Sequence, residues 1–198
     1  EGRDEPAQRT AGWAGVMSLP RVLTLGTDGH LLVEPAAELG LLRSEHAHLG
    51  GLALLPGAGA YGEGLQGNSV ELLLRARAEP PARLALHLCC SCDGAEETVI
   101  VYDWGSEQLS LDRTRSSLYP SAHRGRCEAP LRAGPDGLVE LRIFLDRSVL
   151  EVWGGGACWL TSRIYPARSD SVGIKIASQA AAVQLDQLDF WRLEGIWS

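Results

Sequence analysis

Apolar and polar residues alternate in short runs along most of this chain, and glycine- or proline-rich turns separate the runs. The alternation is clearest from Val139 to Leu145, where every second residue is apolar while Glu140 and Arg142 fall between them. Residues two apart share one face of a strand, so this strand should bury one face and expose the other. Such strands recur about every ten residues, a spacing typical of antiparallel sandwiches. We therefore expect an all-β fold, an antiparallel two-sheet β-sandwich of the concanavalin or lectin-like jelly-roll type.

The last strand of the pattern carries a shift in register. Val183 and Leu185 are followed by Leu188 and Phe190, so the inward-facing positions slip by one residue between the two pairs. An extra residue in one strand of a pair produces a β-bulge, and we expect one at residues 186–187.

Local signals near the start of the chain predict a hairpin followed by a helix. The turn Gly26-Thr27-Asp28-Gly29 separates two apolar runs, residues 22–25 and 31–34, and its residues tolerate positive φ. Residues Pro35–Arg43 place a proline at a helix entrance and leucines on one side. This arrangement predicts one short helix.

The totals are those of a globular domain that binds neither nucleic acid nor membranes. Hydrophobic residues make up 45% and charged residues 22% of the 198, which suffices for one ordinary core. The formal net charge of −7 argues against nucleic acid and anionic membrane surfaces as partners. No run approaches the ~20 apolar residues of a membrane-spanning helix. We expect residues 1–11 to be a flexible leader and residues 12–198 to form one β-sandwich domain.

Cysteines and histidines do not combine into a metal site. Cys90 and Cys92 would share one strand face with neighbouring leucines, which favours small buried side chains over ligands. A structural zinc site needs paired ligands at two separate places, and no second pair exists. His46 and His48 are two residues apart but lack a third ligand of known proximity, so solvated histidines are favoured. We therefore expect no metal site.

Ten residues near the start, Gly12–Arg21, form a short apolar run with small residues between bulky ones, interrupted by a proline. They resemble the segment at which invertases, inulinases and levanases (glycoside hydrolase family 32) leave a catalytic propeller and enter a C-terminal β-sandwich. The resemblance covers nearly the whole chain beyond Gly12. Further motifs follow in the family's order at residues 21–25, 31–35, 118–121, 146–153 and 161–166.

The resemblance implies a non-catalytic domain. The family hydrolyses terminal β-D-fructofuranosyl bonds with retention and without a cofactor, and its catalytic residues lie in Asn-Asp-Pro-Asn, Arg-Asp-Pro and Glu-Cys motifs. Here the only asparagine, Asn68, precedes a serine, Arg3-Asp4 precedes Glu5, and Cys127-Glu128 has the reverse order. We therefore assign no catalytic residue. The implied role is to stabilise an N-terminal catalytic β-propeller that these residues do not include, with homo-oligomer contacts as a further possibility.

Tryptophans and the apolar start of the chain supply the candidate surfaces. Trp104 lies at an expected hairpin tip and Trp197 near the end of the sequence, so both are candidates for a carbohydrate or partner surface. Arg163 and Tyr165 join them as residues that would order a polar network at an interface. The alternative for these two is an arginine stem packed along the sheet with its head in water. The docking face for the propeller is predicted at Trp13, Val16, Met17 and Leu19.

Two other functions stay open at this point. A sandwich with exposed aromatic side chains is a common scaffold for sugar binding, so the chain could be a free-standing fructan- or glycan-binding module. The third interpretation is an adhesion or structural sandwich without a sugar function. Residues upstream of Glu1 discriminate among them, because a propeller with three acidic motifs is either encoded there or not.

Overall fold

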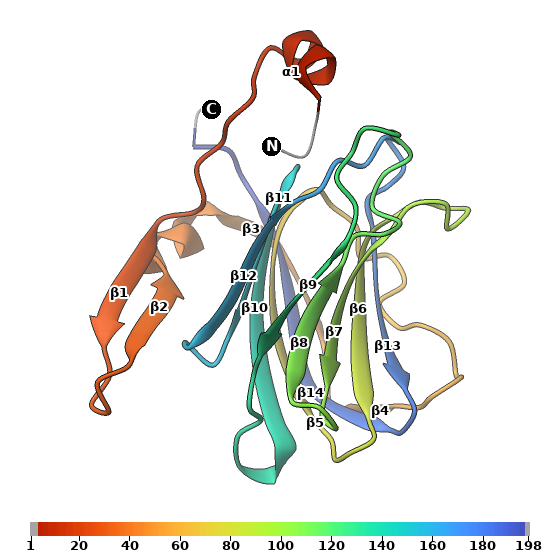
Figure 1. Cartoon of the computed structure of the whole chain (residues 1–198). Coiled ribbons are helices and arrows are strands. Elements are labelled where there is room, and N and C mark those ends of the chain that lie inside the picture. Colours follow the sequence, from red (N-terminus) through yellow and green to blue (C-terminus); the bar gives the residue numbers. More distant parts are fainter. Residues whose placement is uncertain (1–3, 197–198) are drawn as a thin grey trace.

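Two antiparallel sheets face one another and enclose the core of the molecule (Figure 1). They are seen in a computed structural model that describes residues 4–196. The expected all-β sandwich is confirmed. The first sheet has the order β12 (Cys158–Arg163), β11 (Val149–Gly154), β10 (Leu138–Asp146), β5 (Ser69–Arg77), β14 (Val183–Leu193) and β3 (Arg43–Leu49), with β4 (Leu52–Leu54) also paired to β14. The second sheet has the order β13 (Gly173–Gln179), β6 (Arg83–Cys90), β7 (Thr98–Asp103), β8 (Gln108–Asp112) and β9 (Arg126–Pro130).

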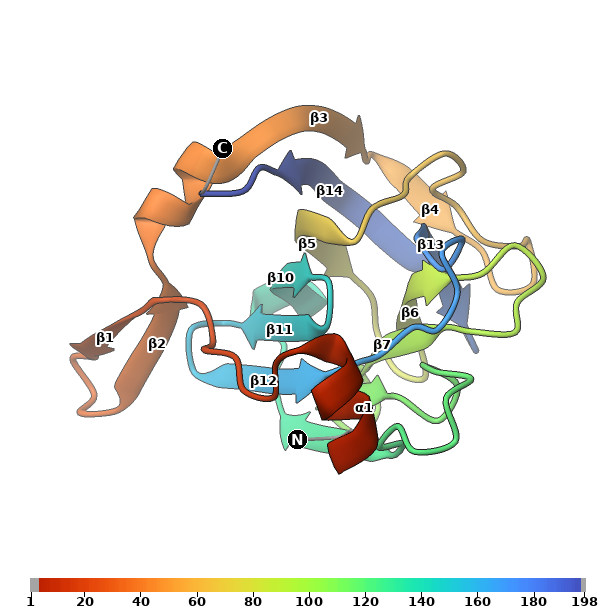
Figure 2. The same ribbon diagram turned by 90° about the horizontal axis from the view of Figure 1, so that it is seen from above.

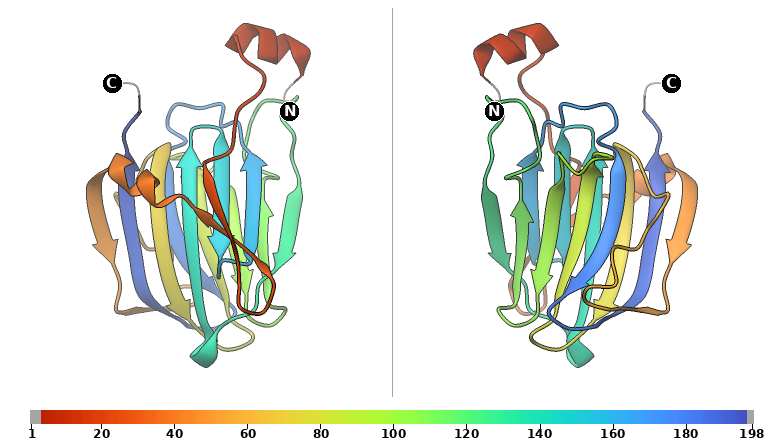
Figure 3. Two further views of the ribbon diagram at one scale, coloured as in Figure 1. Left: turned by 90° about the vertical axis from the view of Figure 1, so that its left-hand side faces the viewer. Right: turned by 90° about the vertical axis from the view of Figure 1, so that its right-hand side faces the viewer.

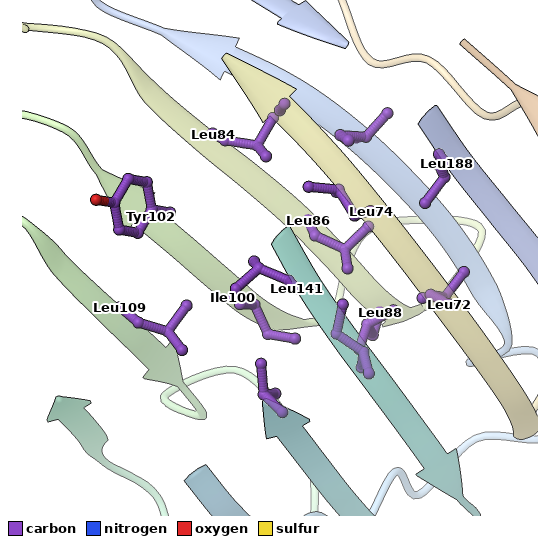
Figure 4. Close-up of a cluster of buried hydrophobic side chains, with 14 of the residues drawn as sticks. Leu72, Leu74, Leu84, Leu86, Leu88, Ile100, Tyr102, Leu109, Leu141 and Leu188 are labelled. Carbon is purple, nitrogen blue, oxygen red and sulfur yellow. The ribbon is translucent and has the colours of Figure 1, made fainter. Parts of the chain in front are cut away.

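Leucines from both sheets fill the core because alternate residues of each strand point inward. Leu72 and Leu74 of β5 and Leu86 and Leu88 of β6 are fully buried. Figure 4 shows them pointing into the space between the sheets. Burying one such side chain contributes about 1.5–3 kcal/mol, so this shared core is the main support of the sandwich.

β10 and β14 follow the pattern expected of them. The four alternating apolar residues from Val139 to Leu145 are all buried, whereas Glu140 is exposed. In β14 the pairing with β5 shifts between Leu185 and Gln187, so the predicted bulge is confirmed.

The helices differ from the sequence prediction in type and in place. β2 (Leu31–Pro35) runs through the proline that was expected to open a helix, and the turn after it is a six-residue 3₁₀-helix, η1 (Ala37–Leu42). Pro35 pairs with Arg21 in the hairpin and the next strand begins at Arg43, so few residues remain for a helix between them. An α-helix that was not predicted, α1 (Glu5–Ala11), lies within the expected leader and has no buried residue. The Asp4 carboxylate caps it by accepting a hydrogen bond from the Ala7 N–H at 2.9 Å.

The cysteines of β6 are not arranged as predicted. Cys89 has a φ of 52°, which breaks the strand's alternation, so Cys89 and its neighbour Cys90 are both buried. Cys92 lies beyond the strand in a turn and is exposed, and it does not share a buried face with Cys90. All five cysteines are free thiols.

β1 (Arg21–Leu25) and β2 form a separate two-stranded sheet beside the sandwich (Figures 1 and 2), so the predicted hairpin is confirmed. Figure 3 shows that the hairpin lies on the outer side of the first sheet. The Val33 N–H donates to the carbonyl oxygen of Gly156 at 2.9 Å, which ties β2 to the turn between β11 and β12. Within residues 4–196 no helix has the length and apolar character needed to cross a membrane.

Candidate interdomain surface

Exposed hydrophobic side chains are concentrated in one short stretch near the start of the chain. Of the thirteen large hydrophobic residues that are exposed among residues 4–196, seven lie within residues 13–31. Met17 is 91% exposed and Leu25 is 75% exposed. We call these seven the apolar stretch: Trp13, Val16, Met17, Val22, Leu23, Leu25 and Leu31.

Four residues of the apolar stretch were not predicted as part of the docking face, and all four lie in the β1–β2 hairpin: Val22, Leu23, Leu25 and Leu31. The register of β1 and β2 pairs Leu23 with Val33 and Leu25 with Leu31, so these four side chains share one face of the hairpin. Val33 is buried, and the three leucines are exposed. A two-stranded hairpin is marginally stable by itself, and an uncovered apolar face does not add to its stability. The only signal in the sequence was that β1 is apolar on both faces.

Glu151 anchors the segment that leads into the hairpin. Its carboxylate is buried in β11 and accepts a hydrogen bond from the Leu19 backbone N–H at 2.6 Å. The Arg21 guanidinium forms an ion pair with the same carboxylate at 2.5 Å and donates to the Thr161 hydroxyl at 2.6 Å. Arg21 also lies over the Trp153 ring, with its guanidinium carbon 5.8 Å from the ring centroid. These contacts fix the hairpin's entry to the first sheet.

Leu19 does not belong to the exposed docking face on which it was predicted. It is partly buried against a small cluster of Leu39, Phe144 and Trp153 on the outer side of the first sheet. Phe144 and Trp153 meet edge to face with ring centroids 5.6 Å apart. The other three predicted docking residues, Trp13, Val16 and Met17, are exposed.

Arg163 and Tyr165 come together with Trp13, the first residue of the apolar stretch. The Arg163 guanidinium carbon is 4.9 Å from the Trp13 ring centroid and 5.2 Å from that of Tyr165. Its nitrogens donate to the carbonyl and hydroxyl oxygens of Ser148 at 3.1 and 2.9 Å. Tyr165 is buried, so its ring offers no open face for a sugar. The arrangement holds Trp13 against the sandwich through cation–π contact.

Trp104 is not the exposed aromatic that sequence analysis predicted. It is only 4% exposed and packs edge to face on Tyr102, with ring centroids 4.8 Å apart. Its indole N–H donates to the carbonyl oxygen of Gly137, in the 3₁₀ turn η2 (Pro135–Gly137), at 2.7 Å. Burial with a satisfied N–H makes Trp104 a core residue. The other tryptophan of this prediction, Trp197, lies outside the described residues.

Four carboxylates are buried among the described residues, those of Glu71, Glu96, Glu151 and Asp189, and each has structural partners. Glu151 has those named above, and Glu71 forms ion pairs with Arg43 and Arg142 at 2.6 and 2.7 Å. Arg142 is thus partly buried by this pair, although its position in the pattern predicted a side chain in water.

Glu96 is the third of these carboxylates and is held without an ion pair. It accepts hydrogen bonds from the Ser171 hydroxyl and from the backbone N–H groups of Leu118, Ala167 and Arg168. Burial by itself would raise the pKa of Glu96, but these hydrogen bonds outweigh it and lower the pKa below its usual range. A carboxylate held in this way accepts protons poorly near neutral pH, so it is unsuited to acid catalysis.

His46 and His48 are half exposed, as expected, and share one partner. His46 donates through Nε2 and His48 through Nδ1 to the same carboxylate oxygen of Asp189, at 2.9 and 2.8 Å. Asp189 lies opposite His48 in the pairing of β14 with β3, which explains the convergence. Within residues 4–196 no group of three His, Cys, Asp or Glu side chains is arranged to hold a metal ion.

The sequence profile described as "Glycosyl hydrolases family 32 C terminal" matches residues 44–192. This chain belongs to that family. The matched range begins in β3 and contains both sheets of the sandwich, whereas the apolar stretch lies before it.

Curated relatives extend the similarity over almost the whole chain. The extracellular exo-inulinase of Aspergillus awamori is 28% identical over 200 residues, covering 96% of this chain and 36% of its own length. The sucrose-6-phosphate hydrolase of Zymomonas mobilis is 30% identical over 195 residues, with the same coverage. The levanase of Bacillus subtilis is 29% identical, covering 95% of this chain and 28% of its own length. The chain therefore spans about a third of the length of these relatives.

Solved structures share the fold. The crystal structure of the exo-inulinase from Aspergillus awamori matches with a TM-score of 0.81 at 26% identity, covering 93% of this chain and 37% of that one. Fructan 1-exohydrolase IIa from Cichorium intybus matches with a TM-score of 0.85 at 20% identity, covering 98% of this chain and 44% of that one. At this identity the second match is a likeness of fold alone.

Proposed function

We propose that this chain is the non-catalytic C-terminal domain of a longer β-fructofuranosidase-type glycosidase, in which it packs against and stabilises an N-terminal catalytic domain. Family membership and the one-third coverage of the relatives support this proposal. The observation that carries it is the apolar stretch, because large hydrophobic side chains that are exposed together in one segment of a globular domain usually belong to an interface. The stretch lies in the part of the chain that precedes the sandwich.

The energetics suit a contact between domains of one chain. Burying a large hydrophobic side chain contributes about 1.5–3 kcal/mol, and seven such residues are exposed here. Most of that gain survives in a covalently linked pair, since the linker supplies a high effective concentration of the partner. The anchors at Glu151 and Arg163 hold the stretch in place before docking, which limits the entropy lost on binding.

The substrate of the longer protein is proposed from its relatives. They are named as an exo-inulinase, a sucrose-6-phosphate hydrolase and a levanase. We accordingly propose hydrolysis of terminal β-D-fructofuranosyl bonds, with all catalytic groups in the N-terminal domain. Among the described residues the two tested aromatic candidates for a sugar surface, Trp104 and Tyr165, are buried, which gives the glycan-binding alternative no support.

The proposal is tested by substituting the hairpin leucines and measuring binding to a separately expressed N-terminal domain. Leu23→Ser with Leu25→Ser should weaken that binding at least about tenfold, since each substitution removes apolar contact area. The matched control is Leu41→Ser with Leu55→Ser, two equally exposed leucines outside the stretch, which should leave binding unchanged.

Two results would overturn the proposal. One is an intact mass of the natural protein that corresponds to these 198 residues alone. The other is a dimer of the isolated chain that the hairpin substitutions convert to monomer while binding to the N-terminal domain is unaffected. The second result would assign the stretch to a homo-oligomer contact.

A further inference from the structure

Arginines on this chain are nearly all paired with carboxylates, and the exceptions are grouped. Of the sixteen arginines among residues 4–196, twelve form an ion pair. The chain has a net charge of −7, so a shortage of carboxylates does not explain the others. The four without an ion pair are Arg113, Arg124, Arg147 and Arg163.

Two of these four arginines line one hollow at the edge of the apolar stretch. The hollow has a volume of about 420 Å³ and is bordered by Val16 and Met17 on one side. Arg113, Arg163 and His123 supply its cationic or protonatable groups, and hydroxyls come from residues such as Thr161 and Ser162. None of its lining residues is an aspartate or glutamate.

The hydrogen-bonding capacity of Arg113 is largely unused. Its Nε is enclosed and has no partner, and its Nη1 reaches the carbonyl oxygen of Arg163 only at 3.4 Å, beyond the usual range. The nearest carboxylate along its strand, Asp112, is already engaged by Arg126 and Thr114. A partly buried cation without a counter-charge is costly, and a guanidinium is shaped to receive a carboxylate through two parallel hydrogen bonds.

We propose that this hollow is a carboxylate-binding site, in which Arg113 and His123 receive the anion. Because a guanidinium lines the hollow and no aspartate or glutamate does, the hollow favours an anion over a neutral sugar. The volume suits a small dicarboxylate, or the side chain of an aspartate or glutamate from a segment that covers Val16 and Met17. Arg163 has a different role. Its nitrogens already donate to Ser148, so it is held in place as part of the wall of the hollow.

Succinate is the probe for this site on the isolated chain. Titration at constant ionic strength should give a saturable one-site isotherm and a concentration-dependent shift of the Arg113 Nε–Hε signal in NMR spectra. Arg113→Gln and His123→Gln should each weaken succinate binding by about tenfold, as loss of a charge-assisted hydrogen bond predicts. Arg132→Gln is the control, because Arg132 is highly exposed and 3.6 Å from Glu107, outside the hollow.

The carboxylate could come from a side chain of the N-terminal domain or from a free small molecule. A protein that also carries the N-terminal domain distinguishes these two sources. If a side chain of that domain fills the hollow, succinate no longer binds and the Arg113 signal already lies at its bound position. If the natural ligand is a free small carboxylate, the titration repeats as in the isolated chain, and either result supports the site. Absence of saturable binding to the isolated chain, or equal binding by Arg113→Gln, overturns it. That failure would leave the docking role of the hairpin leucines untouched.

Discussion

Arg21 and Glu151 form an ion pair of 2.5 Å although 130 positions separate them in the sequence. The Glu151 carboxylate is buried beneath the segment that enters the hairpin, and the partly exposed Arg21 guanidinium lies against it. The pair joins a segment outside the matched family region to β11 within it. The orientation of the hairpin therefore depends on the sandwich through a small number of polar contacts.

Replacing Glu151 with glutamine should destabilise the chain by about 2–3 kcal/mol, because it leaves Arg21 without its counter-charge. The loss is smaller than for a fully enclosed pair, since Arg21 is partly exposed. Urea unfolding followed by tryptophan fluorescence measures it. Glu140→Gln is the matched control, because the pair of Glu140 with Arg75 joins two half-exposed side chains and should cost under about 1 kcal/mol. Equal losses in the two variants would contradict the role assigned to Glu151.

The lowered pKa of Glu96 predicts a loss of stability in acid. A carboxylate whose pKa is lower in the folded than in the unfolded chain contributes stability that is complete above the unfolded value, about 4.3 for glutamate. That contribution disappears as the pH falls through the folded-state pKa. The free energy of unfolding should thus decrease below about pH 5, and Glu96→Gln should show a smaller decrease. Asp112 also has a lowered pKa, so the free energy of unfolding of the Glu96→Gln variant should still decrease in acid, but less steeply. Identical pH profiles for the two proteins would refute this account of Glu96.

The cysteines should differ sharply in reactivity toward a thiol reagent at pH 8. Burial raises the pKa of Cys89 to about 12 and that of Cys90 to about 11, so neither forms much thiolate. Cys92 is exposed and should be modified first. Peptide mapping after a short labelling pulse identifies the modified residue, and Cys92→Ser should remove the fast phase. Rapid labelling of Cys89 in the folded chain would show that β6 opens far more readily than its burial implies.

Trp104→Phe should lower the free energy of unfolding by about 1–3 kcal/mol, because the carbonyl of Gly137 loses its buried donor. Trp159→Phe is the control: Trp159 is exposed, and its substitution should stay within about 0.5 kcal/mol. Thermal and urea unfolding provide the comparison. A Trp104 variant as stable as the control would mean that its hydrogen bond is replaced by water.

The isolated chain should release no fructose from sucrose or inulin. The acidic motifs of the family's catalytic centre do not occur in its sequence, and the four buried carboxylates of the described residues are held by structural partners. A coupled assay for free fructose measures this. Turnover that survives repurification and disappears on substitution of one acidic residue of this chain would show the expectation to be wrong.

Features set by neighbouring residues could be predicted from the sequence, and features set by distant ones could not. The buried face of residues 139–145 follows from local alternation, and the bulge at 186–187 from a local slip. Trp104 was misplaced because its neighbours form a turn, while its burial depends on Gly137, 33 positions away. Leu19 was misplaced for the same reason, because the cluster that covers it comes from β10, β11 and η1.

The candidate surface was predicted only in part. Trp13, Val16 and Met17 could be found because they form an apolar run with no polar face. The hairpin leucines could not, since an apolar strand is equally consistent with the interior of a sheet until its neighbours are known. In the structure β1 and β2 pair with each other and form a sheet of their own. This pairing shows that the leucines are not covered by other described residues.

The place of β14 in the first sheet has a consequence for biosynthesis. This strand pairs with β5 on one side and with β3 and β4 on the other, yet it comprises residues 183–193 and is translated after all of them. On the ribosome, β5 and β3 therefore remain as unsatisfied edges until the last strand emerges. A chain that stalls before Val183 leaves core leucines exposed to solvent, and premature termination there cannot give a closed sandwich.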